Sequence, residues 1–131
     1  MASDAVSSIC PVLGVRDVRA AVRHLVDTLG FEEVAVFEPP GDGEAVYAII
    51  RRGAAEIHLQ IRRRELRGGA RESIECDAYV RVEDADALHA DVVGRGAVVH
   101  FELCDQDYGM RDFTVEGPEG HRIAFGAPLP G

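Results

Sequence analysis

Several residue types are absent from this 131-residue chain or rare in it. There is no tryptophan, and aromatic residues make up only 6% of the sequence, which leaves little surface for stacking flat heteroaromatic ligands. There is no lysine either, so every basic side chain is an arginine. Arginine pairs well with carboxylates, but a codon bias of the source would produce the same composition, so this bias indicates no function.

Cysteines are few and long apolar runs are missing. Cys10, Cys76 and Cys104 are widely spaced, odd in number and form no CxxC motif, which argues against a disulfide scaffold or a zinc finger. No apolar run approaches the ~20 residues that a membrane helix needs. The first residues lack the positive and apolar regions of a signal peptide. We therefore expect a reduced, cytoplasmic protein without a membrane partner.

Charge narrows the range of partners further. The net charge of −9 disfavours nucleic acid and anionic lipid and mildly favours a cationic ligand, although solubility alone would also explain it. The arginine-rich segment 62–73 could suggest a nucleic-acid patch, but Glu65 and Glu72 interrupt it and no aromatic residue accompanies it. We interpret this segment as a solvated linker and expect no nucleic-acid partner.

The first half of the chain has the pattern of a β-α-β-β-β unit. An apolar run at residues 12–15 predicts a strand, and Pro11 places its beginning at a sheet edge or in an arm exchanged between subunits. Asp17 is suited to cap a helix with one apolar face, which Gly30 would end. Three further strands are predicted at residues 31–37, 45–51 and 55–61.

The second half repeats this order. A strand at residues 76–82 is followed by the cap residue Asp84, a helix at 85–93 and a strand at 98–103. A final hairpin joins residues 110–115 to 121–125 through a turn containing Pro118 and Gly120, of which Gly120 supplies the positive φ.

The duplication predicts an α+β fold of two β-α-β-β-β modules in a single domain covering residues 1–131. The modules span residues 8–61 and 75–126, and residues 62–74 link them. One such module cannot cover both faces of its sheet. Pairing two modules therefore predicts a curled mixed sheet with helices outside and a concave, polar-lined cleft inside.

Three stretches carry a resemblance to a known family. They are YGMRDFTVEGPEGHRIAF in the last hairpin, PVLGVRDVRAAVRHLVDTLGF near the start and GAAEIHLQ in the fourth predicted strand. Together they resemble the glyoxalase/bleomycin-resistance/dioxygenase superfamily, also called the vicinal oxygen chelate superfamily. The detailed match is closest to its bleomycin-resistance proteins, which implies a homodimer that traps a bulky cationic drug in clefts at the subunit interface, without catalysis.

The resemblance also identifies the positions at which the superfamily's enzymes hold a divalent metal ion. These positions are occupied here by Cys10, His58, Asp77 and Ala124. Ala124 has no ligand atom, so the resemblance favours a binding protein with no metal or other cofactor and no catalytic residues. The alternative is a metal-dependent lyase, isomerase or dioxygenase that binds a divalent ion through Cys10, His58 and Asp77.

Candidate ligand-binding residues follow from strand alternation and from the resemblance. Alternation places six polar side chains on the concave face: Glu56, His58, Gln60, Asp77, Tyr79 and Arg81. The resemblance puts Tyr108 and Met110 at the mouth of the last hairpin, and Phe37 is a second stacking candidate. Tyr79, Arg81 and Phe37 each also fit a structural role. Arg111 and Asp112 could pair with neighbours across the hairpin rather than touch a ligand.

Overall fold

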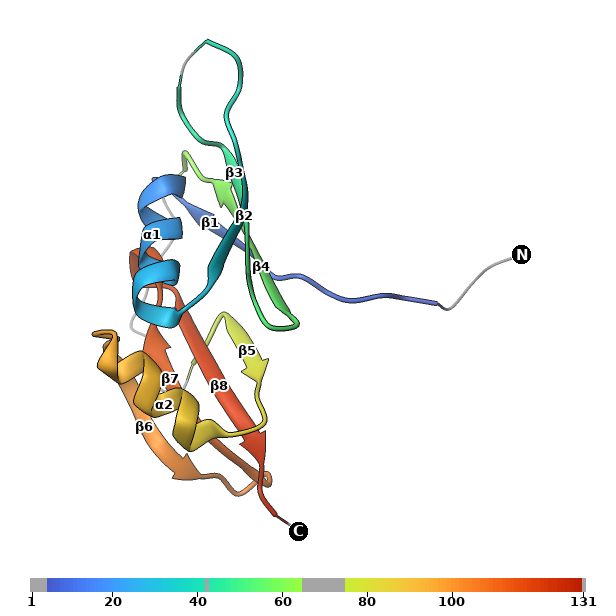
Figure 1. The fold of residues 1–131 in the computed structure, drawn as a ribbon, viewed down its shortest axis with the longest axis vertical. Helices are drawn as coiled ribbons and strands as arrows, with labels where there is room; N and C mark the ends of the chain where they lie inside the picture. Colours follow the sequence, from blue (N-terminus) through green and yellow to red (C-terminus); the bar gives the residue numbers. More distant parts are fainter. Residues whose placement is uncertain (1–4, 42, 65–74, 131) are drawn as a thin grey trace.

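The computed structural model describes residues 5–41, 43–64 and 75–130, and it contains two modules with the same order of elements (Figure 1). The first module consists of β1 (Val12–Val15), α1 (Val18–Leu29), β2 (Glu32–Phe37), β3 (Tyr47–Arg52) and β4 (Ala55–Ile61). The second consists of β5 (Ala78–Arg81), α2 (Ala85–Gly94), β6 (Val99–Asp105), β7 (Met110–Glu116), the short 3₁₀ helix η1 (Pro118–Gly120) and β8 (Arg122–Pro128).

The two predicted helix caps are confirmed. The Asp17 carboxylate accepts a hydrogen bond from the backbone N–H of Ala20, and the Asp84 carboxylate accepts one from Ala87, each at 3.0 Å. A side chain in this role stabilises a helix by about 1 kcal/mol. Gly30 ends α1 with φ at 70°, the left-handed conformation that glycine adopts without steric cost.

Each module folds into a four-stranded mixed sheet of the same topology. The strand orders are β1-β4-β3-β2 and β5-β8-β7-β6, and the β1–β4 and β5–β8 pairs are parallel while the other pairs are antiparallel. The predicted α+β fold class is confirmed, with the strands divided between two sheets. The module boundaries at 8–61 and 75–126 stay a prediction, and residues 65–74 of the predicted linker lie outside the described residues.

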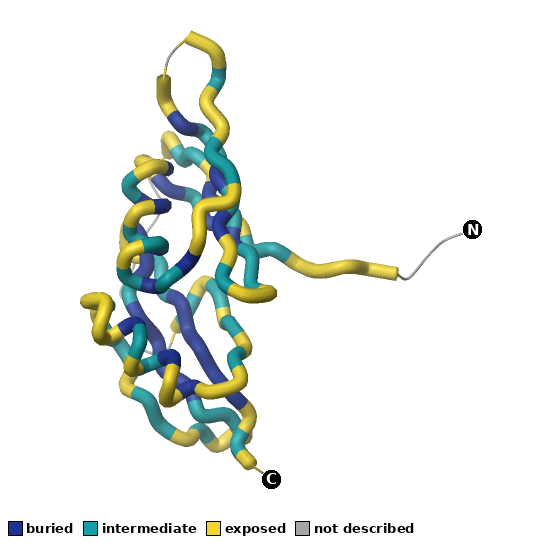
Figure 2. The backbone as a smooth tube through the Cα atoms, in the orientation of Figure 1, coloured by how far each residue is buried: buried dark blue, intermediate teal, exposed yellow. Residues whose placement is uncertain are grey.

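Buried apolar side chains from both modules form one continuous core. Both helices lie on the same side of the molecule (Figures 1 and 2). In the second module the rings of Phe113 and Phe125 stack with centroids 5.6 Å apart. Alternation along β4 buries Ile57 and Leu59 in the core and leaves Glu56 and His58 outside it. On β4 the core therefore uses one face of the strand, and the opposite face carries polar groups.

The turn of the last hairpin fastens the second module to the first. Glu119, whose φ is 52°, accepts hydrogen bonds from the backbone N–H groups of Arg16 (2.7 Å) and Asp17 (3.0 Å) at the start of α1. The ring of His121 is hydrogen-bonded to the Gly14 carbonyl at 2.8 Å. Gly120 has φ at 82°, as its position in the predicted turn requires.

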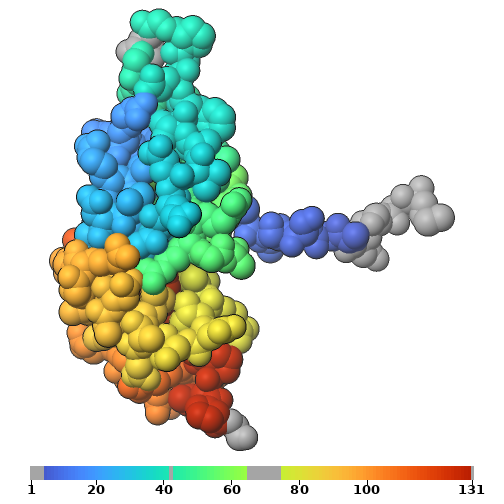
Figure 3. Space-filling model, in the orientation of Figure 1, coloured from blue at the N-terminus to red at the C-terminus, as the bar shows by residue number. Residues whose placement is uncertain are grey.

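The described part of the N-terminal arm, residues 5–9, projects away from the body of the molecule (Figures 1 and 3). It exposes Val6 and Ile9 to 78% and 89%. At its base, the Pro11 carbonyl accepts a hydrogen bond from the His58 backbone N–H at 2.9 Å, so the arm leaves the fold beside β4. Within the described residues, no helix is both long and apolar enough to cross a membrane.

Candidate functional site

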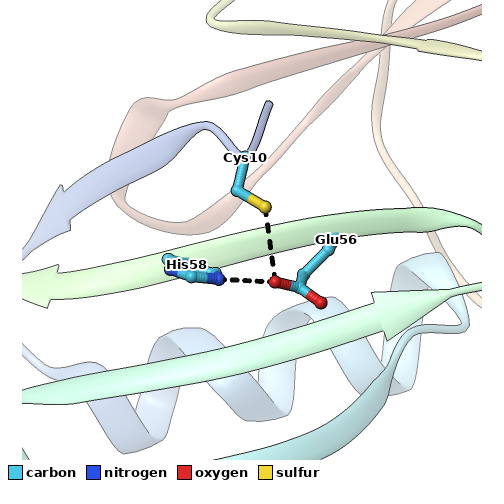
Figure 4. A group of neighbouring side chains, drawn as sticks. All are labelled: Cys10, Glu56 and His58. Carbon is cyan, nitrogen blue, oxygen red and sulfur yellow. Dashed lines mark hydrogen bonds and ion pairs between the residues drawn. The ribbon is translucent and has the colours of Figure 1, made fainter. Parts of the chain in front are cut away.

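A chain of polar side chains lies on the face of the first sheet opposite α1. The ring of His58 is hydrogen-bonded through Nδ1 to the Tyr47 hydroxyl at 2.7 Å. Through Nε2 it is hydrogen-bonded to Glu56 Oε2 at 2.8 Å (Figure 4). An ionised carboxylate only accepts hydrogen bonds, so in the neutral imidazole Nε2 carries the proton and Nδ1 accepts from the phenol. The β3–β4 pairing and the Glu56–His58 spacing on β4 produce this arrangement.

Glu56 is the centre of this cluster. Its Oε1 accepts a hydrogen bond from Arg51 at 2.6 Å, and its Oε2 also accepts one from the Cys10 thiol at 3.3 Å (Figure 4). The hydrogen bonds from Arg51, His58 and Cys10 lower the pKa of Glu56 to about 2. The hydrogen bond to Glu56, together with burial, raises the pKa of the Cys10 thiol. Cys10 is therefore held as a thiol and is not an activated nucleophile.

Three side chains of the cluster are suited to a divalent metal ion. Ligand atoms of Cys10, Glu56 and His58 all lie within 4.8 Å of one another, and sulfur, nitrogen and oxygen donors of this kind are those that zinc accepts. Ala124, at the family's fourth position, is 3% exposed and offers no donor. The donor set thus fits an ion held by three ligands from the first module.

Asp77, the third ligand expected from the resemblance, does not belong to this group. Its Oδ2 lies 3.3 Å from His121 Nδ1 and accepts a hydrogen bond from the Arg122 backbone N–H at 2.8 Å. Glu56 joins Cys10 and His58 instead. Alternation already put Glu56 and His58 on one face of β4, but Glu56 was predicted only as a ligand-binding residue, because the family positions pointed to Asp77.

A pocket of about 490 Å³ adjoins this cluster between the arm, β4 and β5. Its lining is Ile9, Pro11, Ala54, Ala55, Glu56, Ile57, Ala78, Tyr79, Val80 and Arg81. A largely apolar wall with a few polar groups is typical of small-molecule sites. The structure thus brings three predicted ligand-binding residues, Glu56, Tyr79 and Arg81, to one pocket, with His58 hydrogen-bonded to Glu56.

The other predicted ligand-binding residues lie outside the lining of this pocket. Phe37 is exposed at the end of β2, with its ring 6.3 Å from that of Tyr47, and Gln60 is exposed on β4. Tyr108 precedes β7 and Met110 begins it. Their roles in ligand binding stay predictions.

A second polar cluster surrounds Asp112 on β7. This side chain is 4% exposed, and its Oδ2 accepts hydrogen bonds from the hydroxyls of Tyr79 (2.8 Å) and Tyr108 (2.6 Å). Its Oδ1 accepts one from Gln106 Nε2 at 2.9 Å. Burial and the hydrogen bond to Asp112 raise the pKa of Tyr108 to about 12 and also raise that of Tyr79.

Pairing of Arg111 and Asp112 with neighbours across the hairpin was one alternative left open by the sequence, and their partners in the structure lie on several elements. Arg111 binds Asp105 on the adjacent strand and Asp86 on α2, each at 2.9 Å. The partners of Asp112 include Tyr79 on β5, which no spacing in the sequence connects to it. Only the β5–β8–β7 order brings these two side chains together.

Comparison with protein families places the chain in a known group. Residues 8–125 match the model of the Glyoxalase/Bleomycin resistance protein/Dioxygenase superfamily. The protein therefore belongs to this superfamily, as its sequence motifs predict. A search of curated proteins finds no match.

Solved structures of the same fold include both binding proteins and proteins described as enzyme-related. The bleomycin-binding protein from bleomycin-producing Streptomyces verticillus, solved with copper(II)-bleomycin, is 26% identical over 96% of this chain and 99% of its own, with a TM-score of 0.61. TioX from Micromonospora sp. ML1 is 24% identical over 95% of this chain and 100% of its own, with a TM-score of 0.71. A glyoxalase-related enzyme from Clostridium phytofermentans is 18% identical over 95% and 96%, with a TM-score of 0.77.

Proposed function

We propose that this protein sequesters a bulky, cationic small molecule of the antibiotic type and does so without catalysis. The observation that carries the proposal is Ala124, a buried aliphatic residue at the position where the superfamily's enzymes are expected to place a metal ligand. The cluster on the first sheet also lacks an activated nucleophile, since Glu56 raises the pKa of the Cys10 thiol. Capture would then depend on tight binding and slow release.

The pocket and the charge support this kind of guest. The wall formed by Ile9, Pro11 and β5 is mostly apolar, while Glu56 and the net charge of −9 favour a positive group. The 26% identity to the bleomycin-binding protein over nearly the full length of both chains supports the same class of ligand. The absence of tryptophan favours a less extended aromatic guest than bleomycin.

The proposal includes a homodimer with clefts at the subunit interface and a cytoplasmic location. The projecting arm exposes Val6 and Ile9, which a second subunit would cover. The side chains of Cys10, Cys76 and Cys104 form no disulfides, as in a reducing compartment.

A thermal-shift screen of glycopeptide antibiotics and divalent metals tests the proposal. A guest present at about one hundred times its Kd stabilises the native state by about 2.7 kcal/mol, which corresponds to a rise of several degrees in Tm. We expect such a rise with at least one cationic antibiotic, and titration calorimetry should give a fixed stoichiometry without turnover. Binding of no antibiotic, together with conversion of a substrate, would overturn the proposal.

The competing function is a metal-dependent enzyme, and the grouping of Cys10, Glu56 and His58 favours it. A divalent ion held there would supply Lewis-acid chemistry, with the pocket beside Glu56 available to substrate. Metal analysis of the purified protein and of the His58→Ala variant distinguishes the two functions. The enzyme would be favoured by one tightly bound ion per subunit in the native protein and none in the variant. Adding the metal back to metal-free native protein should then restore activity.

A further inference from the structure

The Asp112 carboxylate is buried without a cationic partner in the described part of the chain. Its three hydrogen-bond donors, Tyr79, Tyr108 and Gln106, are all neutral. The adjacent Arg111 is committed to Asp86 and Asp105. A buried carboxylate is normally paired with a positive charge, because neutral donors replace only part of the lost hydration.

The backbone is shaped to bring Tyr79 to this carboxylate. Gly126 pairs with Asp112 between β7 and β8, and a Cβ built on Gly126 would overlap the Tyr79 hydroxyl. The same Cβ would lie 2.7 Å from Tyr79 Cζ and 2.8 Å from Asp112 Cβ, closer than real Cβ contacts. Only glycine therefore leaves room for the phenol. Tyr79 also lines the pocket beside Glu56, so it connects Asp112 to the candidate site.

Tyr108 donates to the same oxygen of Asp112 as Tyr79 but is itself 59% exposed. The turn that carries it is fixed by backbone hydrogen bonds from Gln106 to Met110 (2.7 Å) and from Gly109 to Gln106 (3.1 Å). Its side chain can therefore rotate away while the turn stays in place. Rotation would free one acceptor position on Asp112 Oδ2.

We propose that Asp112 is the anionic centre of a cation subsite, in which an N–H-bearing cation replaces the Tyr108 hydroxyl. Suitable groups are guanidinium, amidinium and protonated primary or secondary amines, because each can donate to Oδ2 and form a charge-assisted hydrogen bond. Tyr79 and Tyr108 supply aromatic faces for the same cation. This subsite rests on the proposed function for its guest, and it specifies where the guest's positive charge is held.

Titration calorimetry with benzamidine, and with benzamide as its neutral analogue, tests the subsite on the full chain. We expect benzamidine to bind at least about tenfold more tightly than benzamide. Tyr108→Phe removes the competing hydroxyl but keeps the ring, and should strengthen benzamidine binding by roughly 2- to 10-fold. Asp112→Asn should weaken it by at least about tenfold. Asp107→Asn, which removes an exposed charge from the turn of the same hairpin and leaves the ion pairs of Arg111 intact, is the matched control and should change it little.

The Tyr108→Phe variant keeps the test decisive even if Asp112→Asn fails to fold. Benzamidine affinity in Tyr108→Phe equal to or below that of the native protein would overturn the subsite, and so would equal binding of benzamidine and benzamide. Capture of an antibiotic that Asp112→Asn leaves unchanged would overturn the subsite while sparing the proposed function. Benzamidine binding at Asp112 in a protein that captures no larger guest would support the subsite and count against that function.

Discussion

The two modules share one topology but place the larger side chains of their parallel strand pair on different strands. On the face opposite the core of the first module, the parallel β1–β4 pair sets smaller residues on β1 against larger ones on β4, with Val12 beside His58 and Gly14 beside Gln60. In the second, the β5–β8 pair reverses this, with Tyr79 beside Ala124 and Arg81 beside Gly126. The same backbone therefore presents its polar groups from the inner strand in one module and from the edge strand in the other.

This reversal decides the chemistry of each sheet. Glu56 and His58 of β4, together with Cys10 before β1, give the first module a partly exposed cluster of thiol, imidazole and carboxylate, with Arg51 as a cationic partner. The small residues of β8 let Tyr79 extend to a buried carboxylate that has no such partner. A duplicated fold can thus carry one cluster suited to a metal ion and another suited to an organic cation.

The largest expected effect is a loss of stability when the space beside Gly126, which Tyr79 occupies in the second module, is filled. Gly126→Ala should destabilise the protein by about 1–3 kcal/mol, because the added methyl group overlaps Tyr79 and crowds Asp112. Denaturant unfolding measures the change. Gly94→Ala is the control, since its Cβ would meet nothing within 4 Å and alanine is the better helix former. Equal stability of the two variants would show that Tyr79 does not need this space.

The contact between the modules should have the next largest effect. Glu119→Ala removes the acceptor for the N–H groups of Arg16 and Asp17 and should destabilise the fold by about 1–3 kcal/mol. Glu119→Gly removes the same carboxylate but accepts the positive φ without strain. We therefore expect the glycine variant to lose less stability than the alanine variant. The reverse order would show that the positive φ at residue 119 does not strain a residue with a side chain.

Alkaline titration tests the hydrogen bonds that two phenols of the second module donate to Asp112. The pKa of Tyr108 is raised to about 12, so its contribution to stability is complete below the ordinary tyrosine value near 10 and is lost as the pH rises toward 12. Near-ultraviolet absorbance of the native protein should show delayed phenolate formation. Tyr108→Phe should remove one of the late-titrating groups. A full phenolate signal near the ordinary tyrosine pKa would contradict the bonding to Asp112.

The smallest effect concerns the thiol of the first module. Glu56→Gln replaces the carboxylate that raises the pKa of Cys10 with a neutral amide, so iodoacetamide should alkylate Cys10 faster at mildly alkaline pH. Peptide mass spectrometry separates this reaction from those of Cys76 and Cys104, which serve as internal controls.

Because the pKa of Glu56 is lowered to about 2, its contribution to stability should persist from neutral pH down to about 4.5 and disappear toward pH 2.

Local sequence signals predicted the order of helices and strands and part of one of the two clusters. Asp17 and Asp84 cap the helices as predicted, because a capping bond joins residues three positions apart. Alternation along β4 placed Glu56 and His58 on one face for the same local reason. The substitution of Glu56 for Asp77 beside Cys10 could not be predicted, because it depends on where the arm meets β4.

By itself, the sequence determined the duplicated β-α-β-β-β order, the family and the polar face of β4, since each follows from the identity and spacing of residues close together along the chain. Only the tertiary structure decided which polar groups share a pocket and that Tyr79 bonds to Asp112, 33 positions away. That contact requires three strands in register and a glycine between two of them, and no periodicity in a linear sequence records such an arrangement.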